Sequence, residues 1–160
     1  MPQPRSAALD AFDRSILALL QLDTRTPLRR IGEQVHLSTA ATQRRIRRLE
    51  EQGVIQAHTA VLDPASVGQA ITLLVEVQAE RTHGADLDAM KAAFSGPEIQ
   101  QCYYVTGHAD FMLVLTVATM ADYEGLARRL FHENRNVKWF KTTVVMDRVK
   151  VGLAVPLAMI

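Results

Sequence analysis

Apolar residues in the first third of the chain recur at the three- and four-residue spacing of an α-helix. The first such stripe follows Asp10, a residue that favours the N-cap because its carboxylate accepts hydrogen bonds from free N–H groups of the first turn. Asp13 adds a negative charge to that turn, where the helix dipole favours it. The pattern predicts a first helix whose apolar stripe contains Phe12, Ile16, Leu19 and Leu20.

Two further helices are predicted in the same part of the chain. The second would be capped by Thr26 and begin at Pro27, whose fixed φ suits the first helical position, and it would end near His36. The third would be capped by Ser38. After it, residues 54–63 read as a strand. The first third of the chain therefore predicts three helices and a strand.

Beyond residue 70 the hydrophobic pattern changes from a helical to a strand-like period. In the first strand-like segment apolar and polar residues mostly alternate, but Leu74 is an apolar residue on the polar side. Thr119 and Asp122 form a capping-box pattern that predicts the start of the last helix. The order β-α-β-β-α-β is that of the ferredoxin-like fold. The strands are predicted at residues 71–77, 99–106, 110–117 and 137–149, and the two helical stripes contain Leu87, Met90 and Phe94, and Tyr123, Leu126, Leu130 and Phe131.

A segment of turn-forming residues, LDPASVGQ at positions 62–69, separates the two patterns. We therefore expect an α+β protein with two domains joined by this hinge. The expected domains are a helix-turn-helix domain at residues 1–61 and a ferredoxin-like domain at residues 70–160, which would carry oligomerisation and effector binding.

Composition and charge indicate an ordinary globular protein with a locally basic region. The chain is 48% hydrophobic and its net charge is +1, but residues 1–60 contain nine arginines and six acidic residues, a net charge of +3. Cys102 is the only cysteine and cannot form an intrachain disulfide, which favours a reducing compartment such as the cytoplasm. Its strand-like surroundings predict a buried, unreactive thiol. The apolar runs are too short to span a membrane.

The run QRRIRR at residues 43–48 places four arginines on the third predicted helix. They could form a solvated face paired with Glu50 and Glu51. The alternative is a DNA contact, because this helix is the second of two joined by a short turn, as in a helix-turn-helix whose second helix enters the major groove. Arginine also contacts phosphates and reads guanine. The expected DNA-binding residues are Ser38, Thr39, Gln43, Arg44, Arg45, Arg47 and Arg48.

The chain resembles the Lrp/AsnC, or feast/famine, family of transcriptional regulators from Leu9 to about Pro156. The resemblance is carried by LDAFDRSILALLQLDTR, LSTAATQRRIRRLEEQGVI, AVLDPASVG, CYYVTGHADFMLVL, YEGL and VVMDRVK, in the family's order. It implies a winged-type helix-turn-helix that binds double-stranded DNA, a C-terminal domain that dimerises through its sheet, and dimers that assemble into an octamer. Leu74 on the polar side of its strand also favours self-association.

The resemblance further implies a small effector, commonly an amino acid, bound between dimers near VTGHAD. This loop could suit a zwitterion, because Gly107 permits exposed N–H donors and Asp110 can accept from an ammonium group. The alternative is a plain hairpin turn that Asp110 caps, with His108 in solvent. The chain departs from the family at two positions. His36 stands where the family usually has glycine, and Phe140 stands where a small polar residue is frequent. The expected effector-binding residues are Thr106, Gly107, His108, Asp110, Phe140 and Thr142.

The sequence offers little support for catalysis. The five histidines show no helical pairing, and no phosphate-binding glycine loop or zinc-ligand spacing is present, so no catalytic residue, cofactor or metal is expected. Tyr103 and Tyr104 are expected to be one core and one interface residue, and Trp139 a packing residue. Two alternatives remain open: an enzyme similar to the siroheme decarboxylases, which share this two-domain architecture, and an oligomeric sensor that does not bind DNA.

Overall fold

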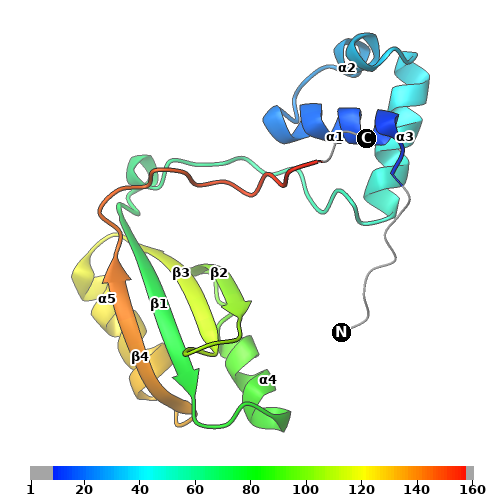
Figure 1. Cartoon of the computed structure of the whole chain (residues 1–160). Helices are drawn as coiled ribbons and strands as arrows, with labels where there is room; N and C mark the ends of the chain where they lie inside the picture. The colour runs from blue at the N-terminus through cyan, green and yellow to red at the C-terminus, as the bar shows by residue number, and fades with distance from the viewer. Residues whose placement is uncertain (1–8, 158–160) are drawn as a thin grey trace. The chain divides into compact units, whose positions relative to one another are not determined.

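Three helices form the N-terminal part of the chain in the computed structural model, which describes residues 9–157 (Figure 1). They are α1 (Ala11–Leu22), α2 (Leu28–Val35) and α3 (Thr39–Glu51). The predicted start of α1 is confirmed by a capping box: the Asp13 N–H donates to the Asp10 carboxylate at 2.8 Å, and the Asp10 N–H donates to the Asp13 carboxylate at 3.3 Å.

The caps of α2 and α3 agree only in part with the sequence pattern. Thr26 was predicted to cap α2, which is wrong, because Pro27 occupies the N-cap and the Thr26 hydroxyl donates to the Asp23 carbonyl at 2.8 Å. That hydroxyl therefore closes the turn after α1. The predicted cap of α3 is confirmed, since the Ser38 hydroxyl accepts from the Ala41 N–H at 3.2 Å.

The turn between α2 and α3 is tight although it lacks the glycine usual in related sequences. His36 ends α2 in the left-handed region with φ of 56°, and it is the only non-glycine residue with positive φ among residues 9–157. The Leu37 N–H donates to the Gly32 carbonyl at 2.9 Å. A side chain at Gly32 would meet the Leu37 carbonyl oxygen at 2.6 Å, so glycine is required there for the close approach.

The helices enclose a small core, and the segment after them is not a strand. Residues 54–63 contain no strand, contrary to the prediction. A strand is stabilised by hydrogen bonds to a neighbouring strand, and none of the described strands pairs with this segment. The buried side chains of the helical core are Ile16, Leu20, Ile31, Val35 and Ile46.

The chain divides into two compact units, and its C-terminal segment belongs with the helices. One unit contains residues up to 60 and those from 151, and the other contains residues 61–150. The expected outer ends of the two domains, residues 1–8 and 158–160, lie outside the described residues. Gln21 of α1 holds the C-terminal segment: its amide donates to the Val155 carbonyl at 3.2 Å, and the Val155 N–H donates to the Gln21 amide oxygen at 2.7 Å.

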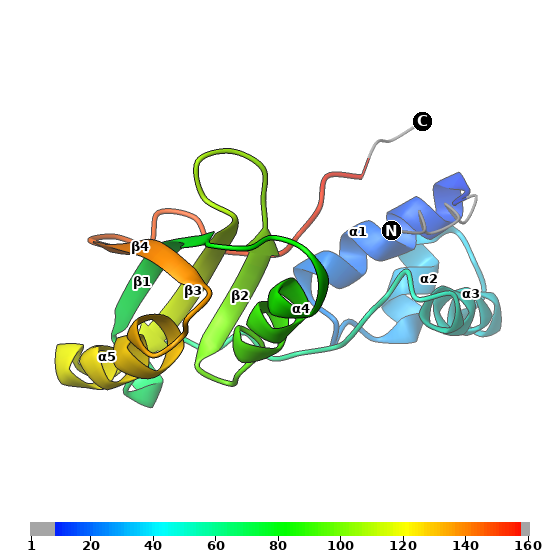
Figure 2. The same cartoon turned by 90° about the horizontal axis from the view of Figure 1, so that it is seen from below.

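The second unit confirms the predicted β-α-β-β-α-β order. Its four antiparallel strands lie in the order β2-β3-β1-β4, and α4 and α5 cover one face of the sheet (Figure 2). The last strand ends at residue 144, earlier than predicted. The elements are β1 (Ile71–Ala79), α4 (Gly84–Ala93), β2 (Ile99–Tyr104), β3 (Phe111–Val117), α5 (Met120–Ala127) and β4 (Val137–Val144), with short helical turns at Ala65–Val67 and Arg128–His132.

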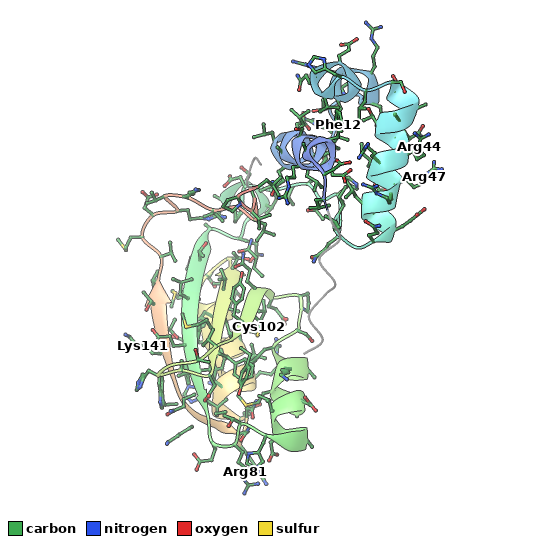
Figure 3. The ribbon with its side chains drawn as sticks, turned by 45° about the vertical axis from the view of Figure 1, so that its right-hand side comes forward. Phe12, Arg44, Arg47, Arg81, Cys102 and Lys141 are labelled. Carbon is green, nitrogen blue, oxygen red and sulfur yellow. The ribbon has the colours of Figure 1, made fainter. Side chains whose placement is uncertain are left out.

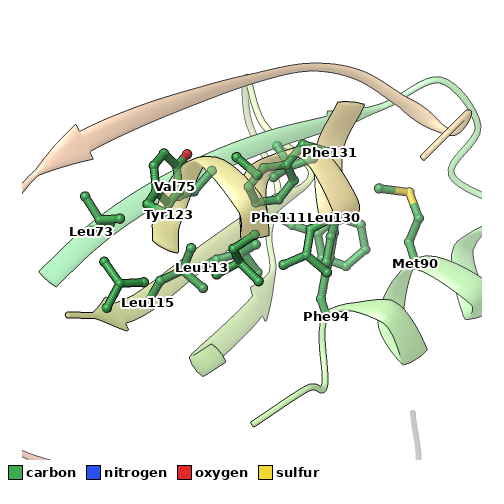
Figure 4. Close-up of a cluster of buried hydrophobic side chains, with 14 of the residues drawn as sticks. Leu73, Val75, Met90, Phe94, Phe111, Leu113, Leu115, Tyr123, Leu130 and Phe131 are labelled. Carbon is green, nitrogen blue, oxygen red and sulfur yellow. The ribbon is translucent and has the colours of Figure 1, made fainter. Parts of the chain in front are cut away.

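The core of the second unit lies between the sheet and its helices (Figure 4). Val75 of β1 is paired with Leu113 of β3, and alternate residues of both strands are buried against Phe94 and Phe131 from the helical side. The predicted stripes of both helices are confirmed as part of this core. The strand residues that alternate with the buried ones, such as Leu74, point to the opposite face of the sheet. No described element of this unit covers that open face.

We expect His36→Gly to stabilise the first unit. A left-handed conformation costs a non-glycine residue roughly 1–2 kcal/mol, and glycine loses about 0.5–1 kcal/mol of this gain through unfolded-chain entropy. The free energy of unfolding should therefore rise by up to about 1.5 kcal/mol, and β-branched His36→Val should lower it. Urea unfolding followed by circular dichroism measures both, while Trp139 fluorescence reports the second unit as an internal control. Equal stability of the two variants would contradict a strained turn.

Candidate DNA-binding and effector sites

The four arginines of α3 fall into two groups, and the first group is bonded to α1. The Arg45 guanidinium donates to the Asp10 carboxylate at 2.7 Å and to the Asp13 carboxylate at 2.9 Å. The Arg48 guanidinium donates to the other Asp13 oxygen at 2.5 Å. The Asp13 side chain is only 1% exposed, whereas those of Arg45 and Arg48 are partly exposed. These contacts therefore join the first turn of α1 to the middle of α3.

The contacts favour the charged forms of Asp10 and Arg45. The N–H of Asp13 and the guanidinium of Arg45 hold the pKa of the Asp10 carboxyl below its usual value, and the carboxylates raise the pKa of Arg45. The Arg45 guanidinium also lies 5.3 Å from the centre of the Phe12 ring. Pairing of the arginines with Glu50 and Glu51 was the alternative interpretation, but the described side-chain partner of the Glu50 carboxylate is the His58 ring, at 3.0 Å.

The second group, Arg44 and Arg47, is exposed. Neither side chain forms an ion pair with any residue between 9 and 157. Both project from α3 away from α1 and Phe12 (Figure 3). Thr39 and Gln43 are also exposed on α3, whereas the Ser38 hydroxyl is used in the helix cap. The exposed arginines give α3 a positive surface on the second helix of a helix-turn-helix.

The VTGHAD loop between β2 and β3 is tied to the sheet by its aspartate. The Asp110 carboxylate accepts from the Ala79 N–H at 2.8 Å, and the Asp110 N–H donates to the Val77 carbonyl at 2.9 Å. Gly107 has φ of 131°, a conformation that favours glycine. The exposed His108 ring lies 4.9 Å from the Trp139 ring. One oxygen of Asp110 thus bonds the loop to the end of β1 and does not cap the loop itself.

Phe140 and Thr142 lie apart from this loop, on the face of β4 that points to the helices. The Phe140 ring stacks on the Phe131 ring at 4.7 Å, and the Thr142 hydroxyl is hydrogen-bonded to the Tyr123 hydroxyl. Burial raises the pKa of Tyr123. The structure therefore divides the predicted effector residues between the β2–β3 loop, with Thr106, Gly107, His108 and Asp110, and the helix-facing side of β4.

A hollow of about 360 Å³ opens beside Phe140 and Thr142. Its polar and aromatic lining combines a carboxylate, a guanidinium, two hydroxyls and an imidazole, and none of the loop residues contributes to it. Sequence reasoning missed the helical part of this lining, although Glu124 and Arg128 are one helical turn apart beside the predicted stripe. The lining includes Tyr123, Glu124, Arg128, His132, Phe140 and Thr142.

Two predictions about side chains of β2 are corrected by the structure. Cys102 is exposed, not buried, because β2 is an edge strand, although partial burial raises the pKa of its thiol. Tyr103 and Tyr104 are 50% and 52% exposed, so neither is a core residue. Tyr104 faces the helix side, where its ring lies 5.2 Å from that of Phe111, and Tyr103 faces the open side.

Residues 9–157 contain neither a metal-binding cluster nor a membrane-spanning helix. No group of three or more histidine, cysteine, aspartate or glutamate side chains there could hold a metal ion. None of the helices in that part of the chain is long and apolar enough to cross a membrane.

A helix-turn-helix and a separate sheet domain with a polar hollow define a DNA-binding regulator with a ligand-binding domain. The chain matches the AsnC-type helix-turn-helix domain over residues 9–50 and the Lrp/AsnC ligand binding domain over residues 72–155. It belongs to the Lrp/AsnC family of transcriptional regulators, as the sequence resemblance indicated.

Individual relatives agree with this assignment. The chain is 40% identical to the HTH-type transcriptional regulator y4tD of Sinorhizobium fredii, over 97% of this chain and 92% of the relative. Its fold matches the crystal structure of an AsnC family transcriptional regulator from Agrobacterium tumefaciens, with a TM-score of 0.86 and 29% identity. It also matches the regulator NMB0573 of Neisseria meningitidis, solved in complex with L-Met, with a TM-score of 0.86 and 25% identity. Each structural match covers 93% of this chain and 97% of the other.

Proposed function

We propose that this regulator reads double-stranded DNA with the exposed side of α3, through Gln43, Arg44 and Arg47, with Thr39 at the start of the helix. The observation that carries the proposal is the division of the arginines, because of the four arginines of α3 only Arg44 and Arg47 are exposed without a described carboxylate partner. Arginine in the major groove can contact a phosphate or bind guanine through two hydrogen bonds. Ser38, Arg45 and Arg48 are not in the proposed set, because their side chains are bonded within the protein.

We propose that the protein is located in the cytoplasm, because a regulator with this surface must have access to DNA. We also propose that it has no catalytic role. The alternative of a siroheme-decarboxylase-like enzyme requires tetrapyrrole binding, which would give the purified protein a Soret absorption band when the pigment is supplied. The alternative of a sensor that does not bind DNA would leave α3 without a function for its exposed arginines.

Arg44→Ala and Arg47→Ala should each weaken DNA binding. A lost base contact costs about 1–3 kcal/mol and relaxes specificity at one position, whereas a lost phosphate contact lowers the slope of log K against log salt by about one unit. Fluorescence anisotropy across a salt series distinguishes the two roles. Arg25→Ala, which removes a charge from the loop between α1 and α2, is the control. Unchanged affinity and slope in the double variant would remove α3 from the interface.

We further propose that the protein is a dimer through the open face of its sheet. Leu74 at the middle of β1 is 38% exposed, and Tyr103 on β2 is 50% exposed on the same face. A four-stranded sheet with helices on one side leaves such apolar side chains in water unless another surface covers them. A second copy of the same face would cover them symmetrically.

Leu74→Lys should convert the full-length protein to a monomer, because it would bury a charge in each half of the proposed interface. Met120→Lys is the matched control, since Met120 is similarly exposed, at 43%, but lies at the start of α5. Sedimentation velocity at micromolar concentration measures both. A monomeric wild-type protein, or a Leu74→Lys variant that is still dimeric, would contradict the proposed interface.

We propose that the effector is an amino acid bound in the hollow beside β4. Arg128 can receive its carboxylate and Glu124 its ammonium group, because neither side chain is in an ion pair with another described residue. The Phe140 ring offers an apolar wall. The L-Met complex of the Neisseria relative supports this class of ligand.

The VTGHAD loop could contribute to the hollow only if several copies of the protein assemble. In one chain it does not line the hollow, so a pocket that uses both His108 and Thr142 requires the loop of a second copy. Dimers that associate further, into an octamer in the proposed assembly, would provide such a loop. Effector binding would then shift the distribution of oligomers.

A thermal-shift screen of the amino acids should identify at least one ligand. A ligand at a hundred times its dissociation constant adds about 2.7 kcal/mol to the stability of the folded form. Arg128→Gln should abolish the shift, and Arg129→Gln is the matched control, because Arg129 is paired with Glu98 and does not line the hollow. A shift that survives Arg128→Gln would mean that the ligand binds elsewhere. If no amino acid produces a shift, Phe140→Thr tests whether the ring closes the pocket.

A further inference from the structure

We propose that Asp13 is a positioning residue for DNA binding, which withdraws Arg45 and Arg48 from DNA and so limits binding to unrelated sequences. The inference rests on the proposed function of α3 and deepens it. Asp13 itself is buried in the protein and does not touch DNA. It acts through the arginines that it holds.

The hydrogen bonds of the Asp13 carboxylate leave the two arginines little freedom. One oxygen accepts from Arg45 at 2.9 Å, and the other accepts from Arg48 at 2.5 Å and from the Asp10 N–H at 3.3 Å. An ionised carboxylate with 1% exposure is tolerated only if charged or hydrogen-bonding partners compensate it. If either arginine left for a phosphate, the buried charge would lose a partner.

The spacing of these residues fixes the rotation of α3 about its own axis. Asp10 and Asp13 are three residues apart on α1, and Arg45 and Arg48 are three residues apart on α3, so each pair spans one helical turn. Two points of attachment a turn apart resist rotation. Arg44 and Arg47 each precede a held arginine by one residue, about 100° around the helix. Holding one pair therefore sets the direction of the other.

The network also limits the charge that α3 presents to any DNA. Sequence-independent affinity grows with the number of phosphates contacted, with a salt slope of about 0.9 per contact. Two negative charges compensate Arg45 and Arg48 inside the protein, so two arginines of α3, not four, are available to phosphates. Asp13 would therefore lower non-specific binding more than specific binding.

The test measures salt slopes for the full-length protein on two duplexes of about 30 base pairs, roughly three helical turns. One duplex is selected by the wild-type protein from a random-sequence pool, and the other has the same composition in shuffled order. Two double variants remove the same charge from the same helix. Arg44→Ala with Arg47→Ala should lower the slope by about 0.9 for each lost phosphate contact, and Arg45→Met with Arg48→Met should leave it unchanged.

Asp13→Asn should change the salt slope in the opposite direction. The substitution should release Arg48, whose described carboxylate partner is Asp13, whereas Arg45 keeps its hydrogen bond of 2.7 Å to Asp10. The slope on the shuffled duplex should rise by up to about 0.9, and affinity for it should increase by up to about 8-fold at 0.1 M salt, because one phosphate contact is gained. The ratio of specific to non-specific affinity should fall. A merely structural role for Asp13 would weaken binding to both duplexes and would not raise the slope.

Circular dichroism and a fourth variant serve as controls for correct folding. Asp13→Leu with Arg45→Met and Arg48→Met replaces the whole network by apolar side chains, leaves no buried charge unpaired, and should keep the wild-type slope. A slope lowered by Arg45→Met with Arg48→Met, or by this triple variant, would show that these arginines contact phosphates and would overturn the inference. A wild-type protein that selects no duplex would instead overturn the proposed function itself.

Discussion

The arrangement of the first unit depends on one buried carboxylate. Asp13 completes the capping box of α1 by accepting from the N–H of the N-cap Asp10, and it also receives two guanidinium groups from α3. Breaking a buried ion pair by removing one partner costs about 3–5 kcal/mol, against about 5–15 kcal/mol for the stability of a whole domain. The hydrophobic core alone permits α3 to rotate slightly, whereas a carboxylate with two directed partners does not.

The second unit depends on the period of two in its strands. Alternate residues of β1 and β3 fill the core below the sheet, and the intervening ones create the open face. The same alternation separates neighbours on β4: Trp139 lies beside the His108 ring, and Phe140 packs on Phe131. For this reason Trp139, beside the β2–β3 loop, and Phe140, beside the hollow, are neighbours in sequence but lie on opposite faces of the sheet.

Features that depend on neighbouring residues in the sequence were predicted correctly. Features that depend on contacts between distant residues were missed. The helical stripes, the capping residues Asp10 and Ser38, and the ferredoxin-like order follow from spacing along the chain, and the structure confirms them. The partners of Arg45 and Arg48 are more than thirty residues away, and no local pattern points to them. The strand predicted at residues 54–63 failed for a related reason, because an alternating pattern indicates a strand only if a partner strand exists.

The C-terminal segment connects the strand beside the hollow to the helix-turn-helix unit along the chain. The chain leaves the first unit at residue 60, forms the sheet, and returns at residue 151. β4, which lines the hollow, is the last strand before that return, and Gln21 of α1 exchanges two hydrogen bonds with Val155 as a neighbouring strand would. A ligand bound in this hollow would therefore contact the strand whose chain continues, through residues 145–150, to the segment bonded to α1.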